Sequence, residues 1–132
     1  MENDLKEKHV SYEELCDSAK GLDMQVKEKS YTLNSWEEFY KFKSDFNDAG
    51  FNFREEGYVI EDANGFRVKL KSKFYSFWKQ MRTVKDQIQK GAGNKKVYIT
   101  KEEIEVVKVM EKIDKDKLKS MSIIDVEKMM GY

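Results

Sequence analysis

Apolar and basic side chains alternate over a short segment near the middle of the chain, Phe66-Arg67-Val68-Lys69-Leu70-Lys71. A period of two places the apolar side chains on one face of a β-strand and the basic side chains on the other. This segment follows Glu56-Gly57-Tyr58-Val59-Ile60-Glu61 and the dipeptide Asn64-Gly65, which is typical of a hairpin turn because both residues tolerate a positive φ. The pattern therefore predicts a β-hairpin over residues 56–71.

The length of the hairpin loop decides which side chains share a face, because a shift of one residue turns one strand over. A loop of two or four residues gathers one carboxylate, one phenol and two ammonium groups on one face, from Glu56, Tyr58, Lys69 and Lys71. The opposite face then supplies the core with Val59, Val68 and Leu70. A loop with an odd number of residues would separate the polar groups. We expect an even-length loop and therefore a single polar cluster.

Capping boxes and helical periodicity predict the other elements. Three capping boxes open helices over residues 11–20, over 35–48 and from Thr100 onward, and Gly50 ends the second of these. Apolar periodicity adds helices over 73–90 and 122–130, a strand over 24–33, and a strand start at Phe51 and Phe53 that leads to Glu56. The fold class expected from these elements is α+β, with an antiparallel sheet and flanking helices.

Two of the predicted helices carry a distinct apolar face. The face of helix 35–48 is aromatic and consists of Trp36, Phe39, Tyr40, Phe42 and Phe46. Such residues can stack on nucleobases, but at helical spacing we favour core packing. The face of helix 73–90 consists of Phe74, Phe77, Trp78, Met81, Val84, Lys85 and Ile88, with Lys79 and Arg82 outside it.

The polar cluster of the hairpin has the chemistry of a phosphate site. Two ammonium groups held on strands beside a carboxylate suit a nucleoside triphosphate and its metal, because fixed cations stabilise charge on a phosphoryl group in transfer. The alternative is an ordinary amphipathic hairpin whose lysine and arginine face is solvated. The residues of the hairpin leave these two interpretations evenly balanced.

The motif Glu56-Gly57-Tyr58-Val59-Ile60, followed by Val68-Lys69-Leu70-Lys71-Ser72-Lys73-Phe74-Tyr75, resembles motifs IV and V of the ATP-dependent RNA ligases of the phage T4 RNA ligase 1 type. These enzymes are covalent nucleotidyltransferases. The resemblance implies that Glu56 positions the nucleotide or its Mg²⁺, and that Lys69 and Lys71 bind the phosphates of ATP. It also implies that Tyr58 lines the nucleotide site, and that the complete enzyme joins RNA ends in RNA repair.

The chain departs from that family at the nucleophile. The family uses the lysine of a Lys-x-Asp-Gly motif, which becomes lysyl-AMP, and this sequence contains no such motif. The resemblance then implies a partial nucleotidyltransferase domain over 1–90, a linker over 91–96 and a helical C-terminal extension over 97–132. The chain would be a fragment, one subunit of a split enzyme whose other chain carries the nucleophile, or a descendant that kept part of the site.

Composition narrows the remaining classes of function. One cysteine and one histidine, Cys16 and His9, cannot supply a structural zinc site or a Ser-His-Asp triad. We expect a cytoplasmic protein without a membrane partner, because no apolar run is long enough to cross a bilayer and the N-terminus lacks the pattern of a signal peptide. At 132 residues we expect one domain with a real core but less than a complete ligase.

Charge is strongly segregated although the net charge is zero. Residues 66–101 hold eleven lysines and arginines and a single acid, Asp86. Such a basic segment favours contact with a polyanion such as RNA over the alternative, a chance block of lysines in a chain that is lysine-rich throughout. The candidate RNA-binding side chains are those of Arg67, Lys73, Lys79, Arg82 and Lys85.

The sequence therefore predicts part of an ATP-dependent RNA ligase that binds ATP, Mg²⁺ and RNA ends and is inactive alone. The runner-up is a non-catalytic RNA-binding or protein-interaction module derived from the same fold. A third possibility is a small structural adaptor that binds neither nucleotide nor RNA.

Overall fold

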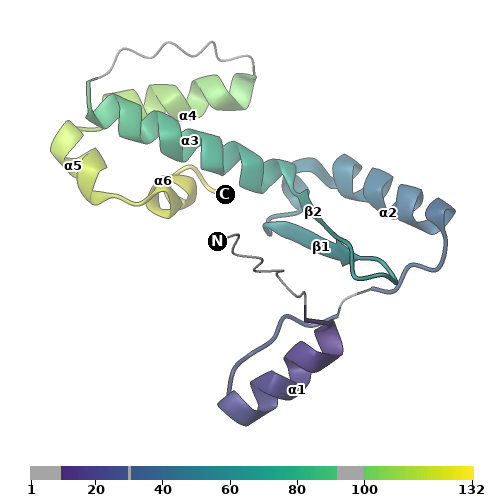
Figure 1. The fold of residues 1–132 in the computed structure, drawn as a ribbon. Coiled ribbons are helices and arrows are strands. Elements are labelled where there is room, and N and C mark those ends of the chain that lie inside the picture. The colour runs from purple at the N-terminus through teal and green to yellow at the C-terminus, as the bar shows by residue number, and fades with distance from the viewer. Residues whose placement is uncertain (1–9, 30, 92–99) are drawn as a thin grey trace, which may run out of the picture. The chain divides into compact units, whose positions relative to one another are not determined.

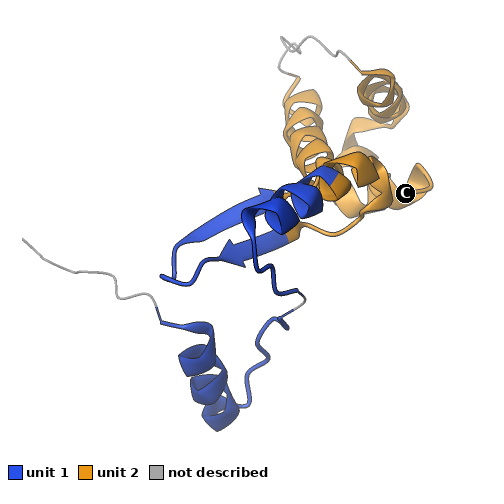
Figure 2. Cartoon of the chain, turned by 90° about the vertical axis from the view of Figure 1, so that its right-hand side faces the viewer, with its two compact units in different colours: residues 1–44, 58–70 blue, residues 45–57, 71–132 orange. Residues whose placement is uncertain are grey.

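The computed structural model describes residues 10–29, 31–91 and 100–132 (Figure 1). The chain divides into two compact units (Figure 2). The first unit comprises residues 1–44 and 58–70, and the second comprises residues 45–57 and 71–132.

The first unit begins with helix α1, Tyr12–Leu22, whose start follows the predicted capping box. The Ser11 hydroxyl accepts a hydrogen bond from Glu14 N at 3.2 Å, and the Glu14 carboxylate accepts one from Ser11 N at 2.9 Å. The helix ends at Asp23, whose φ of 51° lies in the left-handed region. A strand over 24–33 was expected next, but residues 24–29 and 31–33 form no strand, so that prediction is wrong.

Helix α2, Trp36–Ala49, starts in the first unit and ends in the second. Its start is the predicted one, with the Ser35 hydroxyl accepting from Glu38 N at 3.1 Å. The expected core role of its aromatic stripe is confirmed only in part, because Phe46 is buried and Phe39 and Phe42 are partly buried. Trp36 is 71% exposed and Tyr40 is 63% exposed, so the N-terminal half of α2 presents aromatic rings to solvent.

Strands β1, Gly57–Glu61, and β2, Arg67–Lys71, form the predicted antiparallel hairpin. Its loop has three residues, because Asp62 N donates to Phe66 O at 3.0 Å and Gly65 N donates to Asp62 O at 3.0 Å. Gly65 has a φ of 82°, the left-handed conformation of a turn that closes with a bulge. The expected even-length loop is therefore wrong.

The side chain of Asp62 accounts for this loop. Its Oδ1 accepts from Asn64 N at 2.8 Å and from Phe66 N at 2.9 Å. These bonds hold the chain in an aspartate-centred turn, in which only the glycine of the Asn64-Gly65 pair needs a positive φ.

The hairpin supplies little of the expected core. Val59 is 56% exposed and Val68 is 41% exposed, and Leu70 is only partly buried. The strand start expected at Phe51 and Phe53 is also wrong, since Gly50–Asn52 form a short 3₁₀ helix, η1.

The second unit holds the hydrophobic core around helix α3, Lys73–Gln89. Packed with it are α4, Lys101–Lys112, α5, Lys115–Ser120, and α6, Ile123–Met129. The predicted core face of α3 is confirmed for Phe74, Phe77, Trp78, Met81, Val84 and Lys85. The other helices contribute Val106, Val107, Met110, Leu118 and Val126. The Phe51 ring of η1 lies 5.0 Å from that of Phe77.

The last three helices each begin at an N-cap. The capping box of α4 at Thr100 and Glu103 is the predicted one, and the helix expected over 122–130 is α6. Helix α5 was not predicted. The Asp114 carboxylate caps it by accepting from Asp116 N at 3.0 Å and Lys117 N at 3.2 Å.

The fold is thus α+β, and its compact units follow a different division from the expected domains. Helix α3 belongs to the same unit as α4, α5 and α6, whereas the expected boundary separated it from them at 91–96. Of that linker, residues 92–96 lie outside the described residues. None of the helices formed by the described residues combines the length and apolar character that a bilayer crossing requires.

Candidate functional site

Glu56 and Lys71 form an ion pair in the second unit, at the open end of the hairpin. Lys71 Nζ donates to Glu56 Oε1 and lies 4.7 Å from the centre of the Tyr75 ring. Both charged side chains are partly exposed, at 36% for Lys71 and 52% for Glu56. A pair this exposed adds little stability, but it uses one donor of the ammonium group and offsets its charge.

The backbone beside this pair is fixed by Ser72, which is 1% exposed. Ser72 N donates to Glu56 O at 2.9 Å, and its hydroxyl donates to Glu55 O at 2.6 Å. The same hydroxyl accepts from Tyr75 N at 2.9 Å and so caps α3. One buried serine therefore fixes the backbone both at the end of the hairpin and at the start of α3.

Tyr58 and Lys69 belong to the first unit and lie on opposite faces of the hairpin. With Asp62 paired to Phe66, Tyr58 stands opposite Leu70 and Val59 stands opposite Lys69. The Tyr58 ring packs 5.2 Å from Phe42 and 5.9 Å from Tyr31, whereas Lys69 is exposed. The predicted cluster of four polar groups on one face is therefore not formed, because the loop has an odd number of residues.

Arg67 is already engaged within the first unit. Its Nε donates to Glu61 Oε2 at 2.5 Å, and its second guanidinium nitrogen donates to Val10 O at 2.8 Å. To bind an RNA phosphate, Arg67 would have to give up one of these bonds or use its remaining donors.

The cations of α3 fall into two groups. Lys73, Lys79 and Arg82 are exposed, and within the described residues none of them forms an ion pair. Lys85 is only 6% exposed and lies on the core side of the helix, so most of its side chain is out of reach of RNA, and its role in RNA binding stays a prediction. A long lysine can bury its carbon chain in this way while its ammonium group reaches toward the surface.

The charge of Lys85 helps to lower the pKa of Asp125 in α6. The pKa of Asp125 is lowered first by the hydrogen bond from the Ser122 hydroxyl, then by that from the Ser122 backbone, and to a smaller extent by Lys128 and Lys85. Lys85 thus makes a small electrostatic contribution within the second unit.

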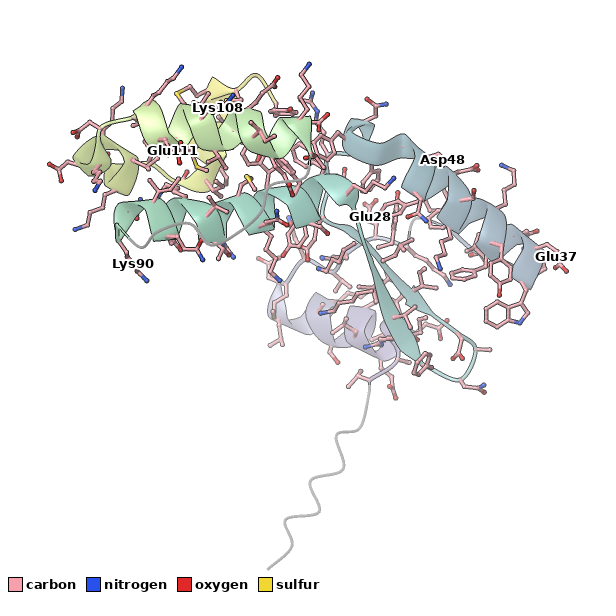
Figure 3. The ribbon with its side chains drawn as sticks, turned by 90° about the horizontal axis from the view of Figure 1, so that it is seen from above. Glu28, Glu37, Asp48, Lys90, Lys108 and Glu111 are labelled. Atoms are coloured by element: carbon pink, nitrogen blue, oxygen red, sulfur yellow. The ribbon has the colours of Figure 1, made fainter. Side chains whose placement is uncertain are left out.

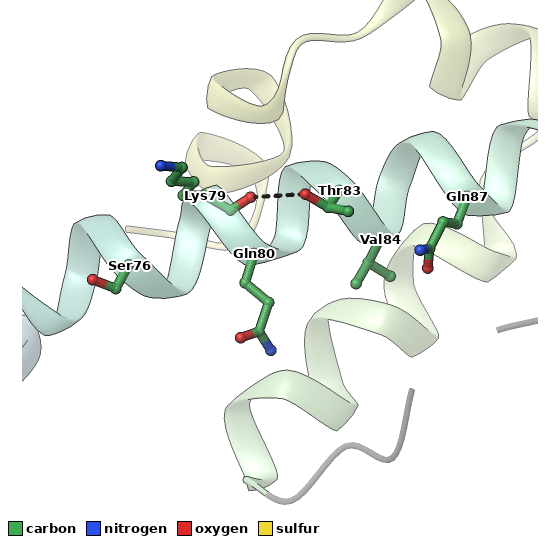
Figure 4. A pocket seen from close by; sticks show the side chains of 6 residues that line it. All are labelled: Ser76, Lys79, Gln80, Thr83, Val84 and Gln87. Atoms are coloured by element: carbon green, nitrogen blue, oxygen red, sulfur yellow. Dashed lines mark hydrogen bonds between the residues drawn. The ribbon is translucent and has the colours of Figure 1, made fainter. Parts of the chain in front are cut away.

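A shallow groove runs along α3 and includes one of the exposed cations, Lys79 (Figure 4). It is lined by Ser76, Lys79, Gln80, Thr83, Val84 and Gln87. Gln80 and Val84 point toward α4, where Gln80 Nε2 donates to Glu103 Oε1 at 2.6 Å. The Thr83 hydroxyl donates to Lys79 O at 3.5 Å.

The neutral residues of this groove are not among those predicted from the sequence. The available signal was their spacing, since polar side chains at 76, 80, 83 and 87 follow the four-three-four rhythm of one helix face. That rhythm is inconspicuous because the opposite face of the same helix is strongly aromatic.

The residues implied to hold ATP and Mg²⁺ do not by themselves fit a complete site for them. Mg²⁺ bound to a nucleotide usually takes one or two carboxylates, phosphate oxygens and water. Glu56 is one carboxylate, and its Oε1 already accepts from Lys71. The described part of the chain contains no cluster of three or more metal-binding side chains. Further ligands would have to come from elsewhere.

Comparisons with protein-family models, with curated proteins and with solved structures found no match for this chain.

Proposed function

We propose that this chain is a non-catalytic RNA-binding module whose α3 contacts the phosphates of the RNA. The observation that carries the proposal is the pair of exposed cations Lys79 and Arg82, which within the described residues have no acidic partner. Unpaired cations can release counterions from a polyanion without first breaking an ion pair of their own.

The surroundings of this pair strengthen the proposal. Lys79 and Arg82 lie in the basic segment 66–101, whose only acid is Asp86. They project from a helix whose other side is packed in the core, so the backbone that carries them is held in place. Contacts of this kind position the RNA but do not read its sequence.

A salt titration tests the proposal. The affinity for a fluorescent twelve-nucleotide RNA is measured by anisotropy at several KCl concentrations. Each phosphate contact to a single strand contributes about 0.7 to the slope of log K against log salt. The double variant Lys79→Ala/Arg82→Ala should therefore bind more weakly, with a slope shallower by about 1.4.

The matched control removes two lysines from α4. Lys108, labelled in Figure 3, and Lys112 are both exposed, and Lys108→Ala/Lys112→Ala changes the net charge by the same amount. This control should keep the wild-type slope. The proposal is wrong if wild type does not bind at low salt, or if both double variants lose the same affinity.

A second candidate is a partial adenylyl-transfer site that another chain completes. It is favoured by the contact between Glu56 and Lys71, the residues that match motifs IV and V in the resemblance to RNA ligases. On this hypothesis, calorimetry of the same samples should detect binding of ATP with MgCl₂ that Lys71→Ala abolishes. The RNA-binding proposal instead expects RNA affinity that is independent of ATP and Mg²⁺.

A further inference from the structure

The groove that Lys79 lines also contains side chains that contacts to phosphate do not require. Four of its six lining residues are neutral and polar: Ser76, Gln80, Thr83 and Gln87. Hydroxyl and amide groups can each donate and accept hydrogen bonds, whereas a phosphate only accepts them. The groove is therefore suited to a ligand that carries hydroxyl groups beside its phosphates.

Hydrogen-bonding capacity is left over at several of these positions. Gln80 uses its amide nitrogen on Glu103, which leaves its oxygen as an acceptor. Within the described residues, the side chains of Ser76 and Gln87 form no hydrogen bond, and Gln87 is half-buried. A half-buried amide without a partner favours a ligand that can both donate to it and accept from it.

The dimensions of the groove suit a short stretch of single strand. From Ser76 to Gln87 the helix rises by about 16 Å at about 1.5 Å per residue. At about 3.4 Å per nucleotide of a stacked strand, this length corresponds to roughly five nucleotides. Lys79 lines the groove within this span and can contact a phosphate there while the neutral side chains face the sugars, and Arg82 follows on the same helix outside the groove.

From this arrangement we infer that the α3 groove selects RNA over DNA by hydrogen bonding to ribose 2′-hydroxyl groups, chiefly through Gln87 and Ser76. The inference rests on the proposed function, and it adds the class of substrate. The 2′-hydroxyl is both a donor and an acceptor, and it is the group by which a protein tells RNA from DNA at a given position.

Three uridine octamers test the inference by anisotropy: the ribose form, the 2′-deoxy form and the 2′-O-methyl form. Wild type should bind the ribose octamer roughly threefold to tenfold more tightly than the deoxy octamer, as one net hydrogen bond would give. The 2′-O-methyl octamer, which cannot donate from its 2′ oxygen and is bulkier there, should also bind more weakly than the ribose form.

Two variants separate the preference for ribose over deoxyribose from the overall affinity for the octamers. Ser76→Ala/Gln87→Met removes the hydrogen-bonding groups but keeps helix-forming residues of similar size, and it should abolish the preference while leaving the salt slope unchanged. Lys79→Ala/Arg82→Ala should weaken all three octamers and keep their ratios.

The outcomes distinguish the two proposals. If wild type binds the ribose and deoxy octamers equally, with the expected salt slope, the inference about the groove is wrong and the phosphate-binding proposal stands. Selection that survives in Ser76→Ala/Gln87→Met also overturns the inference. If no octamer binds at low salt, both proposals fail.

Discussion

Leu118 provides a direct test of the packing that stabilises the second unit. It is the only buried residue of the six-residue helix α5, and its side chain is 0% exposed. It belongs to the same core cluster as Met81 and Val84 of α3. The substitution Leu118→Ala removes this anchor and leaves a cavity in the core.

The expected loss has two parts. A fully buried leucine contributes about 1.5–3 kcal/mol through removal of its surface from water, and the cavity raises the cost of truncation to about 2.7–5 kcal/mol. The hydrogen bond from Gln89 Nε2 to Leu118 O, at 2.9 Å, uses a backbone oxygen and is kept in the variant. The loss therefore reports packing and not hydrogen bonding.

Urea unfolding followed by far-UV circular dichroism measures the change in the free energy of unfolding. The control is Ile124→Ala in the neighbouring helix α6, where the side chain is 55% exposed and the cost should stay within about 0.5 kcal/mol. A loss below about 1 kcal/mol for Leu118→Ala, or equal losses in the two variants, would refute the packing of α5 on α3.

Two further predictions concern a helix cap and a turn. Ser122→Ala removes the hydroxyl that donates to Asp125 Oδ2 at 2.8 Å, so an NMR titration should show the pKa of Asp125 rising toward its ordinary value. Because the pKa of Asp125 is lowered in the folded state, the stability that Asp125 contributes is present above its unfolded pKa and is lost as pH falls through its folded pKa. The free energy of unfolding of Ser122→Ala should therefore fall less on acidification than that of wild type. Gly65→Ala should destabilise the hairpin by about 1 kcal/mol, because the φ of 82° is unfavourable for alanine although no atom lies within 4 Å of the added carbon. Gly65→Asn should cost less, and faster amide exchange in β1 and β2 of the alanine variant than of the asparagine variant checks this; equal exchange would contradict it.

Short sequence patterns predicted a helix well where the pattern alone fixes the start of the helix or its buried face. Capping boxes placed the starts of α1 and α4, and the apolar face of α3 was strong enough to identify nearly every buried residue of that helix. These features depend on residues within a few positions of one another. They are therefore readable from sequence without knowledge of the tertiary contacts.

The candidate site was harder to predict because it depends on a single turn. Asn64-Gly65 marked the position of the hairpin loop, but the side chain of Asp62 set its length at three residues. That one residue moved Tyr58 to the face opposite Lys69. Similarly, the aromatic spacing of α2 did not reveal that Trp36 and Tyr40 would remain exposed.

The two tryptophans differ in a way that makes the chain its own spectroscopic reporter. Trp36 is in the first unit and 71% exposed, whereas Trp78 is in the second unit and 4% exposed, with Tyr132 5.5 Å from its ring. Loss of helical packing should shift the emission of Trp78 to longer wavelength and expose it to a quencher such as iodide, while Trp36 is quenched already in the native state. With Trp36→Phe and Trp78→Phe, each compact unit can be followed separately during unfolding, and the cooperativity between the units becomes a measurable quantity.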